Sequence, residues 1–448
     1  MSATRTGTKT LSRRLALALP LAAAGCSFFE DNLIDPPKPK LPGKRVALRR
    51  TGRELVVDNP RHVQVRVPAP SLRAAWNQAG GTATHEFGHP ATAASVQQAW
   101  RADIGTGSSY RAKIPAAPVT DESRVFTIDS DGLVRAFDIQ SGQRVWQFDT
   151  TPQDNDNVNI GGGIAVDGGI LYVSTGRAEA LALEAATGAL KWRVPLITAA
   201  RSAPTVADGQ VSIALLGNVV VSLAASDGHR LWSYQGSDSA TALLGLPAPA
   251  YASGLLVAGF GSGELVCLRA RTGAVVWIDS LASGLTGTEK GGLSAVHGMP
   301  VIQDGRVFAT GLGGLMLSLD LRSGRRLWER DIASAETACL AGDWLFVLST
   351  DSELAAISRL DGSVIWVTQL QKFQNEEDNS DPITWFGPLL AGGRLLLVSN
   401  AGTTVAVDPS SGEKLGQQDL AGPAALAPIA AQNSVFVVTE DATLLALR

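Results

Sequence analysis

The stretch LVRAFDIQSGQRVW, which runs from Leu133 to Trp146, is repeated along the chain with a few substitutions in each copy. Each copy has an apolar run, a short turn that ends in Gly, a few residues and then Trp. Five further copies end at Trp192, Trp232, Trp277, Trp328 and Trp366. A seventh copy, TVAVDPSSGEKLG, has Gly416 where the others have Trp. A repeat of this length decides the architecture, because one such unit cannot bury its faces alone and must stack on its neighbours.

The repeat has the length of a propeller blade. Successive Trp residues are 38 to 51 residues apart, close to the roughly 40–50 residues of a four-stranded blade. Upstream of each Trp phrase lie further apolar runs divided by Gly turns, as in PTVADGQVSIALLG from Pro204. Runs of this kind predict strands and hairpins. Eight units are marked by their first residues, which are Pro118, Gly163, Pro204, Pro249, Pro300, Ala338, Pro388 and Pro428.

The last unit stops at Arg448 before any Trp strand, and the missing strand can be found at the other end of the chain. The segment SVQQAWRADIG places Trp100 46 residues before Trp146. A strand from the N-terminal side that completes the last blade closes the ring and removes an open edge. We therefore predict an all-β, eight-bladed propeller over residues 76–448, with four-stranded antiparallel blades. Blade 8 is expected to combine residues 95–105 with residues 423–448.

The repeated Trp is interpreted as a structural residue that docks neighbouring blades. A large flat side chain at a fixed place in each blade buries roughly 150–250 Å² and offers a stacking surface, and the preceding Gly permits a left-handed turn. This interpretation covers Trp100, Trp146, Trp192, Trp232, Trp277, Trp328 and Trp366. Gly416 then marks the place where looser packing between blades is expected.

The first residues resemble an export signal of a bacterial lipoprotein. A basic stretch through Arg14 is followed by the apolar run Leu15–Ala24 and by Gly25-Cys26. The segment LAAAGC resembles a lipobox, which implies that residues 1–25 are a signal peptide and that Cys26 is acylated. The alternative is an ordinary signal whose Cys is incidental. Ser12-Arg13-Arg14-Leu15 also resembles a twin-arginine signal, so the export route stays open.

Residues 26–75 are expected to form a tether. Pro36, Pro37, Pro39 and Pro42, interspersed with Lys38, Lys40 and Lys44, are typical of an extended, solvated linker. Short strand-like pieces, RELVVDN and HVQVRV, fall within it. By resemblance to lipoprotein sorting signals, Ser27 after the Cys favours the outer membrane, with the propeller on its periplasmic face.

Two segments imitate metal sites. His85-Glu86-Phe87-Gly88-His89 matches the zinc-protease signature H-E-x-x-H, but that chemistry needs a helix, and the surrounding Gly and Pro residues argue against one. The acidic loops Asp154–Asn157 and Glu376–Asp381 lack the full calcium-loop spacing. We therefore expect no metal and no cofactor, and an ordered loop near Trp76 that seals the ring.

The positions of the cysteines argue against a disulfide, and the charge argues against nucleic-acid binding. Cys267 and Cys339 fall in non-adjacent blades, so buried thiols are expected rather than a disulfide. The net charge is −4 and charged residues make up 18% of the chain. No basic patch interleaved with aromatics is present in the sequence, so nucleic-acid binding is not expected.

The blade phrase, with its Asp, Ser or Thr, Gly and Trp, resembles the repeat of pyrroloquinoline-quinone dehydrogenases. Those enzymes need a calcium-bound quinone and, in many, two adjacent Cys residues, which this chain lacks. Lipobox, tether and eight blades together resemble the BamB family of outer-membrane lipoproteins. LDLRSGRRLWERDI (Leu319–Ile332) is typical of that family, and Trp76–Gly81 and Thr384–Pro388 resemble its alphaproteobacterial branch.

The BamB resemblance implies a non-catalytic scaffold of the β-barrel assembly machinery. It would bind the periplasmic domains of BamA, join the other Bam subunits and aid assembly of outer-membrane barrels from unfolded precursors. A quinone dehydrogenase and a ligand-sensing propeller remain the alternatives.

The family's contact with BamA falls on two loops of this chain. One is Thr241-Ala242-Leu243-Leu244-Gly245 and the other is Ser294-Ala295-Val296-His297. Leu244 replaces the family's Arg, and Ala295 and His297 replace its two Asp residues. The interface is therefore expected to be more apolar here, or shifted. The partner-binding residues implied are Thr241, Leu243, Leu244, Ser294, Ala295 and His297.

Replacement of Cys26 by Ala should release the protein from the membrane fraction, because the acyl chains have no other attachment point. The measurement is fractionation of cells that export the variant, with immunoblotting of membrane and soluble fractions. Retention of Cys26→Ala in the membrane fraction would show that lipidation is not the anchor.

Overall fold

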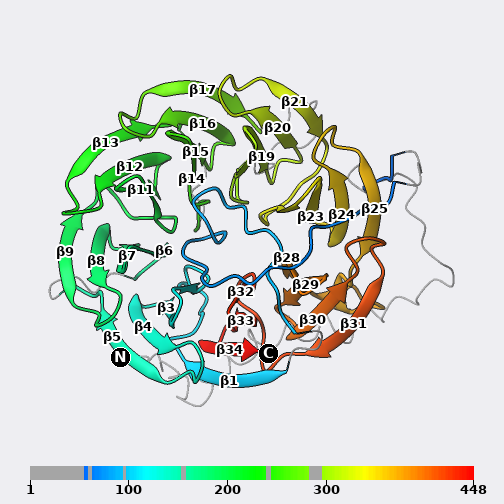
Figure 1. The fold of residues 1–448 in the computed structure, drawn as a ribbon, viewed down its shortest axis with the longest axis horizontal. Coiled ribbons are helices and arrows are strands. Elements are labelled where there is room, and N and C mark those ends of the chain that lie inside the picture. Colours follow the sequence, from blue (N-terminus) through cyan, green and yellow to red (C-terminus); the bar gives the residue numbers. More distant parts are fainter. Residues whose placement is uncertain (1–54, 59–62, 94–96, 153–157, 239–243, 282–294) are drawn as a thin grey trace, which may run out of the picture. The chain divides into compact units, whose positions relative to one another are not determined.

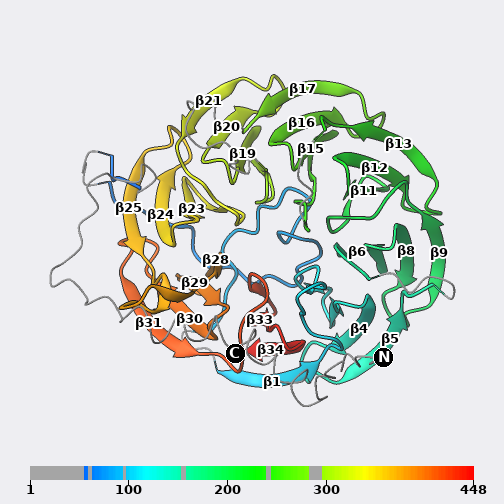
Figure 2. The ribbon, with the colours of Figure 1, turned by 180° about the vertical axis from the view of Figure 1, so that it is seen from behind.

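The computed structural model describes residues 55–58, 63–93, 97–152, 158–238, 244–281 and 295–448. These residues belong to one compact unit that runs from Gly52 to Arg448. Eight four-stranded antiparallel sheets stand around a common axis like the blades of a propeller, as Figures 1 and 2 show from opposite sides. The predicted fold is confirmed. Among the described residues, no helix has the length and apolar character needed to cross a membrane.

Each blade runs from an inner strand at the axis to an outer strand at the rim. Blade 1 is β2(Val119–Thr120), β3(Arg124–Ile128), β4(Leu133–Asp138) and β5(Arg144–Asp149). Blade 2 is β6(Gly162–Asp167), β7(Ile170–Thr175), β8(Glu179–Glu184) and β9(Leu190–Pro195). Blade 3 is β10(Thr205–Ala207), β11(Gln210–Leu215), β12(Val219–Ala224) and β13(Arg230–Gln235). Blade 4 is β14(Ala250–Ala252), β15(Leu255–Gly259), β16(Glu264–Arg269) and β17(Val275–Ser280).

The second half of the ring repeats this order. Blade 5 is β18(Val301–Gln303), β19(Arg306–Thr310), β20(Met316–Asp320) and β21(Arg326–Arg330). Blade 6 is β22(Cys339–Ala341), β23(Trp344–Leu348), β24(Glu353–Ser358) and β25(Val364–Gln369). Blade 7 is β28(Trp385–Ala391), β29(Arg394–Ser399), β30(Thr403–Val407) and β31(Lys414–Asp419). A small hairpin, β26(Phe373–Asn375) with β27(Ser380–Pro382), precedes blade 7.

Blade 8 is built from both ends of the described chain. Its inner strands are β32(Ile429–Ala431), β33(Ser434–Val438) and β34(Thr443–Leu447), and its outer strand is β1(Gln98–Asp103). β1 pairs with β34 in antiparallel register, from Gln98 opposite Leu447 to Asp103 opposite Thr443. The register shifts between Gln98 and Trp100, as it does beside the Trp of the other blades. The closing strand therefore reproduces the geometry of the outer strands, as predicted.

The Trp of each blade packs on the turn Gly of the next blade. A Cβ added to Gly188 would lie 2.7 Å from the ring of Trp146, and one added to Gly362 would lie 2.9 Å from the ring of Trp328. The same contact joins the other blades in pairs, which are Trp100–Gly142, Trp192–Gly228, Trp232–Gly273, Trp277–Gly324 and Trp366–Gly412. These Gly residues have φ between +69° and +78°, a region where a Cβ is unfavourable. Gly is therefore required at this position for two reasons, the left-handed turn and the close contact with the Trp ring.

The indole N–H adds a hydrogen bond to the same junction. Trp146 Nε1 donates to the carbonyl of Ala185 at 3.0 Å, three residues before the turn Gly188. Trp192, Trp232, Trp277, Trp328 and Trp366 donate to the equivalent carbonyls at 2.7–3.1 Å. Because a buried donor must find an acceptor, this bond sets the angle at which the blades meet. These contacts support a docking role for the Trp residues.

A small residue in the third strand makes room for the Trp. Ala136 stands opposite Trp146 on one side and Phe126 on the other, and the two rings lie 5.9 Å apart by centroid. In blade 4 the small residue is Cys267, opposite Trp277. Cys267 and Cys339 are buried free thiols, as predicted, and burial raises the pKa of each to about 12.

Gly416 occurs at the one junction that has no turn for a Trp to contact. The following blade is number 8, whose third strand ends at the C-terminus while its fourth strand arrives from β1. A Cβ at Gly416 would meet nothing within 4 Å, and all six residues of β31 are exposed. Seven Trp residues therefore serve seven turns, and the missing Trp follows from where the ring is closed.

The C-terminal residue takes a hydrogen bond at the closing junction. Arg448 Nη2 donates to the carbonyl of Ile139 at 2.9 Å, the acceptor that the Trp100 indole would use by analogy with the other blades. The Trp100 N–H accordingly has no hydrogen-bond partner among the described residues. Arg448 Nε also donates to Ser434 at 2.9 Å, so the chain end is tied to two blades.

The segment 63–92, which we call the strap, crosses the ring and bonds to every blade. Its backbone contacts, at 2.6–2.9 Å, are Trp76 with Thr120, Asn77 with Val166, Ala83 with Tyr251, Thr84 with Ile302, Pro90 with Gly392 and Arg73 with Gln432. The Gln78 amide bonds to both backbone groups of Val206 at 2.8 Å, and Trp344 Nε1 donates to the Arg66 carbonyl at 3.1 Å. The strap is the blue trace at the centre of Figure 1, and it lies behind the blades in Figure 2.

Part of the expected tether therefore belongs to the propeller. Val65 is buried, and Ser71 and Pro90 form a β-bridge. Farther upstream, the Asp58 backbone N–H bonds to the Val364 carbonyl at 3.0 Å, and its carboxylate lies 3.0 Å from Arg330. The described residues of 55–75 differ in this from a solvated linker, because Leu55, Asp58 and Arg66 have partners on blades 5 and 6 and Arg73 has one on blade 8. Cys26 and the Pro-rich run lie outside the described residues.

The difference between two turn positions should appear in the free energy of unfolding. Gly362→Ala forces a Cβ against Trp328 at a left-handed backbone position, and should lower stability by about 2 kcal/mol or more. Gly416→Ala meets no neighbour and should be neutral or stabilising by about 0.5–1 kcal/mol. Urea denaturation followed by Trp fluorescence gives both values. Equal effects of the two substitutions would contradict the docking role of the turn Gly.

Candidate partner-binding face

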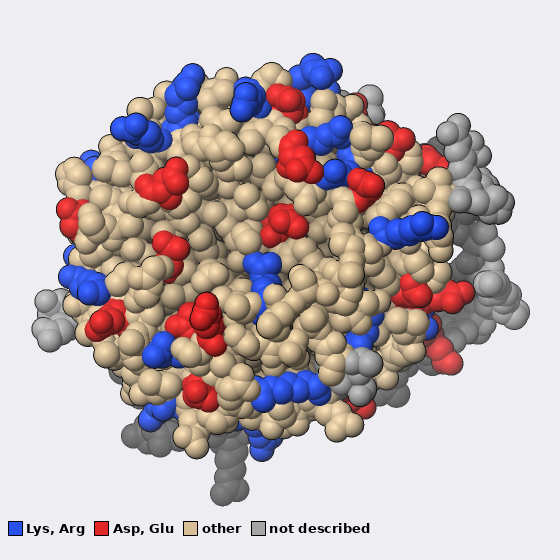
Figure 3. Space-filling view, viewed as in Figure 1, with Lys and Arg blue, Asp and Glu red and all other residues tan. Residues whose placement is uncertain are grey.

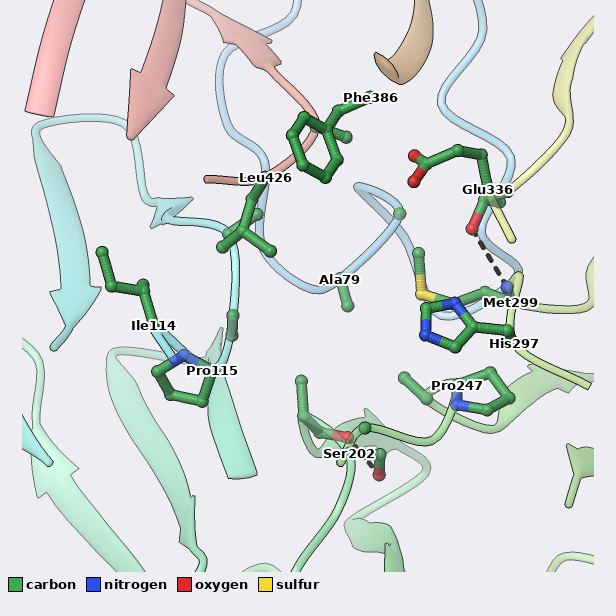
Figure 4. A pocket seen from close by; sticks show the side chains of 18 of the residues that line it. Ala79, Ile114, Pro115, Ser202, Pro247, His297, Met299, Glu336, Phe386 and Leu426 are labelled. Atoms are coloured by element: carbon green, nitrogen blue, oxygen red, sulfur yellow. Dashed lines mark hydrogen bonds between the residues drawn. The ribbon is translucent and has the colours of Figure 1, made fainter. Parts of the chain in front are cut away.

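The loops that lead from one blade to the next gather on the face opposite the strap, and they surround a pocket on the axis. The pocket has a volume of about 400 Å³. Figure 4 shows Ile114, Pro115, Pro247, Phe386 and Leu426 around it, each from a different loop or blade start except the first two. These side chains converge because each precedes an inner strand or, for Phe386, stands at the start of one, and inner strands surround the axis.

The strap closes the inner end of this pocket. Trp76, Ala79, Gly80 and Phe87 line it together with the interblade loops, and the Trp76 and Phe87 rings lie 5.1 Å apart by centroid. On the strap face the centre of the ring is filled, and charged side chains are scattered over it without a continuous patch of one sign (Figure 3). The pocket, which we call the socket, is therefore closed at one end by the strap and opens on the face of the interblade loops.

Basic side chains line one side of the socket. Arg111 and Lys113 are exposed residues of the loop between β1 and β2, and Arg201 belongs to the loop between β9 and β10. The Arg201 guanidinium donates to the backbone carbonyls of Ile160 and Ala200. Burial lowers the pKa of Arg201. Within the described residues it has no carboxylate partner, so its charge is balanced only by backbone dipoles.

Glu336 lies on the other side of the socket, as Figure 4 shows. Its carboxylate accepts a hydrogen bond from the Gly387 N–H at 3.0 Å. Burial raises the pKa of Glu336 to about 7, an effect that the Gly387 hydrogen bond only partly offsets. The His297 ring, nearby in the same view, donates from Nδ1 to the Ala335 carbonyl at 2.8 Å. The acidic side of the socket therefore carries a carboxyl group that titrates near neutral pH.

The structure brings two of the predicted partner-binding residues to this face. Leu244 is 62% exposed, and His297 is exposed on the neighbouring interblade loop; both line the socket. Ala295 is fully buried, and its backbone carbonyl accepts a hydrogen bond from the Leu312 N–H, so its side chain is not at the surface where a partner was expected to contact it. Thr241, Leu243 and Ser294 lie outside the described residues.

The sequence reasoning missed Arg201, Glu336 and Phe386. Each lies two or three positions before a unit start that the sequence marks, and these starts are Pro204, Ala338 and Pro388. His297 has the same relation to Pro300. Since every interblade loop reaches the axis just before its inner strand, a comparison of these positions would have found the lining of the socket.

The segment that imitates a zinc site is used by the strap instead. His85 Nδ1 donates to the Pro300 carbonyl at 2.8 Å, and burial lowers the pKa of His85 to about 4. His89 uses both ring nitrogens, because Nδ1 donates to Pro68 at 2.6 Å and Nε2 accepts from the Gly393 N–H at 2.8 Å. The described residues contain no group of three His, Cys, Asp or Glu placed to hold a metal.

The structure describes one of the two acidic loops that were considered as calcium sites. Asp154–Asn157 lies outside the described residues. Glu376–Asp381 is the exposed tip of the β26–β27 hairpin, where Asn375 donates to Asp378 at 3.0 Å. That bond is an ordinary turn contact.

The fold and its repeated phrase define an eight-bladed propeller of the pyrroloquinoline-quinone repeat class. The sequence profile of the family described as outer membrane protein assembly factor BamB matches residues 90–159, 130–368 and 372–448. The chain belongs to this family.

Individual relatives and structures are similar over most of the chain. The BamB of Yersinia pestis is 26% identical over 359 residues, which are 79% of this chain and 88% of the relative. The crystal structure of BamB from Moraxella catarrhalis superposes with a TM-score of 0.66 at 18% identity, covering 79% of this chain and 99% of that one. The quinohemoprotein alcohol dehydrogenase of Comamonas testosteroni superposes almost as well, with a TM-score of 0.65 at 14% identity, covering 84% and 80%. The fold by itself therefore does not distinguish BamB proteins from quinone-dependent dehydrogenases.

The residues at the axis do not fit a calcium-bound quinone. Calcium takes six to eight oxygen ligands, several of them carboxylates. Among the described lining residues of the socket, Glu336 is the single carboxylate, and it faces Arg111, Lys113 and Arg201. A donor set with this composition favours an anion over a divalent cation.

The Glu336 carboxyl should make stability depend on pH. Because the pKa of Glu336 is higher in the folded than in the unfolded protein, protonation of this carboxyl stabilises the folded state. This contribution to the free energy of unfolding is complete below the unfolded pKa of 4.5 and is lost as pH rises through about 7. Glu336→Gln should therefore raise the free energy of unfolding by up to about 3 kcal/mol at pH 8 and by little at pH 4.5. Urea denaturation at both pH values is the measurement, with exposed Glu413→Gln as the matched control. A difference that does not change with pH would contradict this account.

Proposed function

We propose that this protein is a non-catalytic scaffold of the β-barrel assembly machinery, which binds periplasmic domains of BamA at its interblade-loop face. Membership of the BamB family carries the proposal. The printed names of the relatives describe assembly factors of the outer membrane. The role extends to contacts with other Bam subunits and to helping unfolded barrel precursors reach the site of assembly.

The BamA contact is assigned to two neighbouring loops, 241–245 and 294–297. Leu244 supports the assignment, because a Leu exposed by 62% is a large apolar group at the surface, and apolar anchors are typical centres of protein interfaces. His297 stands on the next loop around the same socket. With Leu in place of the family's Arg, and with His297 in place of an Asp, the contact would depend on apolar burial more than on ion pairs.

Absence of catalysis is supported by the chemistry of the axis. The described socket has one carboxyl group, Glu336, and its imidazole, His297, is already bonded to a backbone carbonyl. Neither is paired with a nucleophile. A scaffold needs a rigid face rather than a reactive group, and the hydrogen bonds from the strap to all eight blades supply that rigidity.

The protein is proposed to work at the periplasmic face of the outer membrane, held there by lipid on Cys26. Two acyl chains are sufficient for stable anchoring. The strap begins within the same segment that would lead from the lipid to the propeller.

Leu243→Asp combined with Leu244→Asp should lower co-purification with BamA at least tenfold, because charged side chains would have to be desolvated in the interface. The measurement is affinity purification from detergent-solubilised membranes with quantitative immunoblotting. Leu360→Asp is the matched control, since Leu360 is 68% exposed but lies on a turn of blade 6 away from these loops. Unchanged co-purification of the double variant, with the control also unchanged, would contradict the assignment of this loop.

A further inference from the structure

The socket on the axis has the form of a ligand site. Its volume of about 400 Å³ falls within the range of roughly 300–1,000 Å³ that is usual for such sites. Its walls are apolar side chains, including Ile114, Met299, Phe386 and Leu426, and the strap closes its inner end. An apolar group of a ligand can therefore enter from the interblade-loop face and be surrounded on all other sides.

Arg201 indicates the charge of the ligand. Buried or half-buried cations are normally paired, yet the described residues place no carboxylate within ion-pair distance of Arg201, and its Nε has no hydrogen-bond partner. Arg111 and Lys113 line the same side of the socket, and Lys113 is 3.7 Å from Glu440 at the surface. The acidic group that faces them is Glu336, on the far side. The cationic side thus has room for one more anion.

The interblade loops offer apolar contacts to a ligand that extends beyond the socket, as a peptide chain would. Exposed large apolar residues occur on four successive interblade loops, and these are Tyr110 at 98%, Val158 at 49%, Ile197 at 50% and Leu244 at 62% exposed. The described parts of the other four interblade loops carry none. Single exposed apolar residues need no explanation, but Leu244 lines the socket itself and Tyr110 adjoins the socket residue Arg111 in the chain. A peptide that leaves the socket on this side would contact them.

We propose that the socket binds an extended peptide that inserts a bulky apolar side chain along the axis and places an adjacent Asp or Glu carboxylate on Arg201. Charge complementarity selects this occupant, since a neutral apolar peptide would leave Arg201 unpaired and a basic one would be repelled. The inference rests on the proposed function only for the source of the peptide, which would be an unfolded barrel precursor. The socket shares Leu244 and His297 with the proposed BamA contact, whereas Arg111 and Arg201 belong to the socket alone.

The test is fluorescence anisotropy with the full-length protein in detergent and short labelled Gly/Ser peptides. One peptide contains Phe-Glu, a second Phe-Gln and a third Ala-Glu. The Phe-Glu peptide should bind at least tenfold more tightly than either of the others, since each lacks one of the two contacts; tenfold corresponds to about 1.4 kcal/mol. Binding should weaken as salt rises, because the carboxylate contact is electrostatic.

Arg201→Gln should reduce the affinity for the Phe-Glu peptide to that for Phe-Gln and leave the Phe-Gln affinity unchanged. Arg111→Gln, at an exposed position where folding is not at risk, should weaken Phe-Glu binding severalfold. Arg271→Gln, exposed on a blade 4 turn away from the socket, is the matched control and should have no effect.

Equal affinity for Phe-Glu and Phe-Gln, or an Arg111→Gln variant that binds Phe-Glu as tightly as the unmodified protein, would overturn the proposal. So would the absence of measurable binding to all three peptides. Retained co-purification of BamA with either outcome would leave the scaffold function standing and remove the peptide site alone. Because Leu244 lines the socket as well as the proposed BamA loop, the two sites are separated by Arg111→Gln and Arg201→Gln, which should lower peptide binding and leave co-purification of BamA unchanged.

Discussion

The contact between each Trp and the turn Gly of the next blade is the interaction on which the rest of the structure depends. A four-stranded blade has two apolar faces and cannot be stable alone, so its position is set by what its neighbours offer. The ring of Trp328 covers Gly362 and its N–H reaches the Arg359 carbonyl, which joins packing and hydrogen bonding at one place. Seven copies of this contact determine the spacing of the inner strands, and therefore the width of the socket at the axis.

The strap converts the ring into a closed scaffold. A propeller without it would have a channel along the axis, with eight inner strands whose free backbone groups face water. Instead the strap forms hydrogen bonds with all eight blades. At blade 3 these bonds come from the side-chain amide of Gln78, which bonds to both backbone groups of Val206. The same segment that seals one face therefore creates a blind socket on the other. The apparent zinc motif belongs to this device, and its His residues bond to backbone groups at Pro300, Pro68 and Gly393.

The candidate site shows how far sequence reasoning reaches. The loop containing Leu244 and the loop containing His297 are neighbours because they precede consecutive blades, which the repeat in the sequence already indicates. The orientation of single residues was beyond the sequence: Ala295 points beneath its loop and is buried, whereas His297, two positions later, is exposed. Arg201 and Glu336 come from blades far apart in the chain, and no local pattern joins them across the axis.

The sequence by itself determined the number of blades and the closure of the ring by the strand that contains Trp100, because a repeat of this length with Gly turns and apolar runs must stack its units side by side to bury their faces. It also marked Gly416 as an exception. Only the tertiary structure showed that this exception stands where the ring is closed, that residues 63–92 bind all eight blades, and that Arg201, which has no carboxylate partner among the described residues, shares a socket with Glu336. These features depend on contacts between residues distant in the chain, which are decided by the meeting of the blades at the axis and not by any local preference.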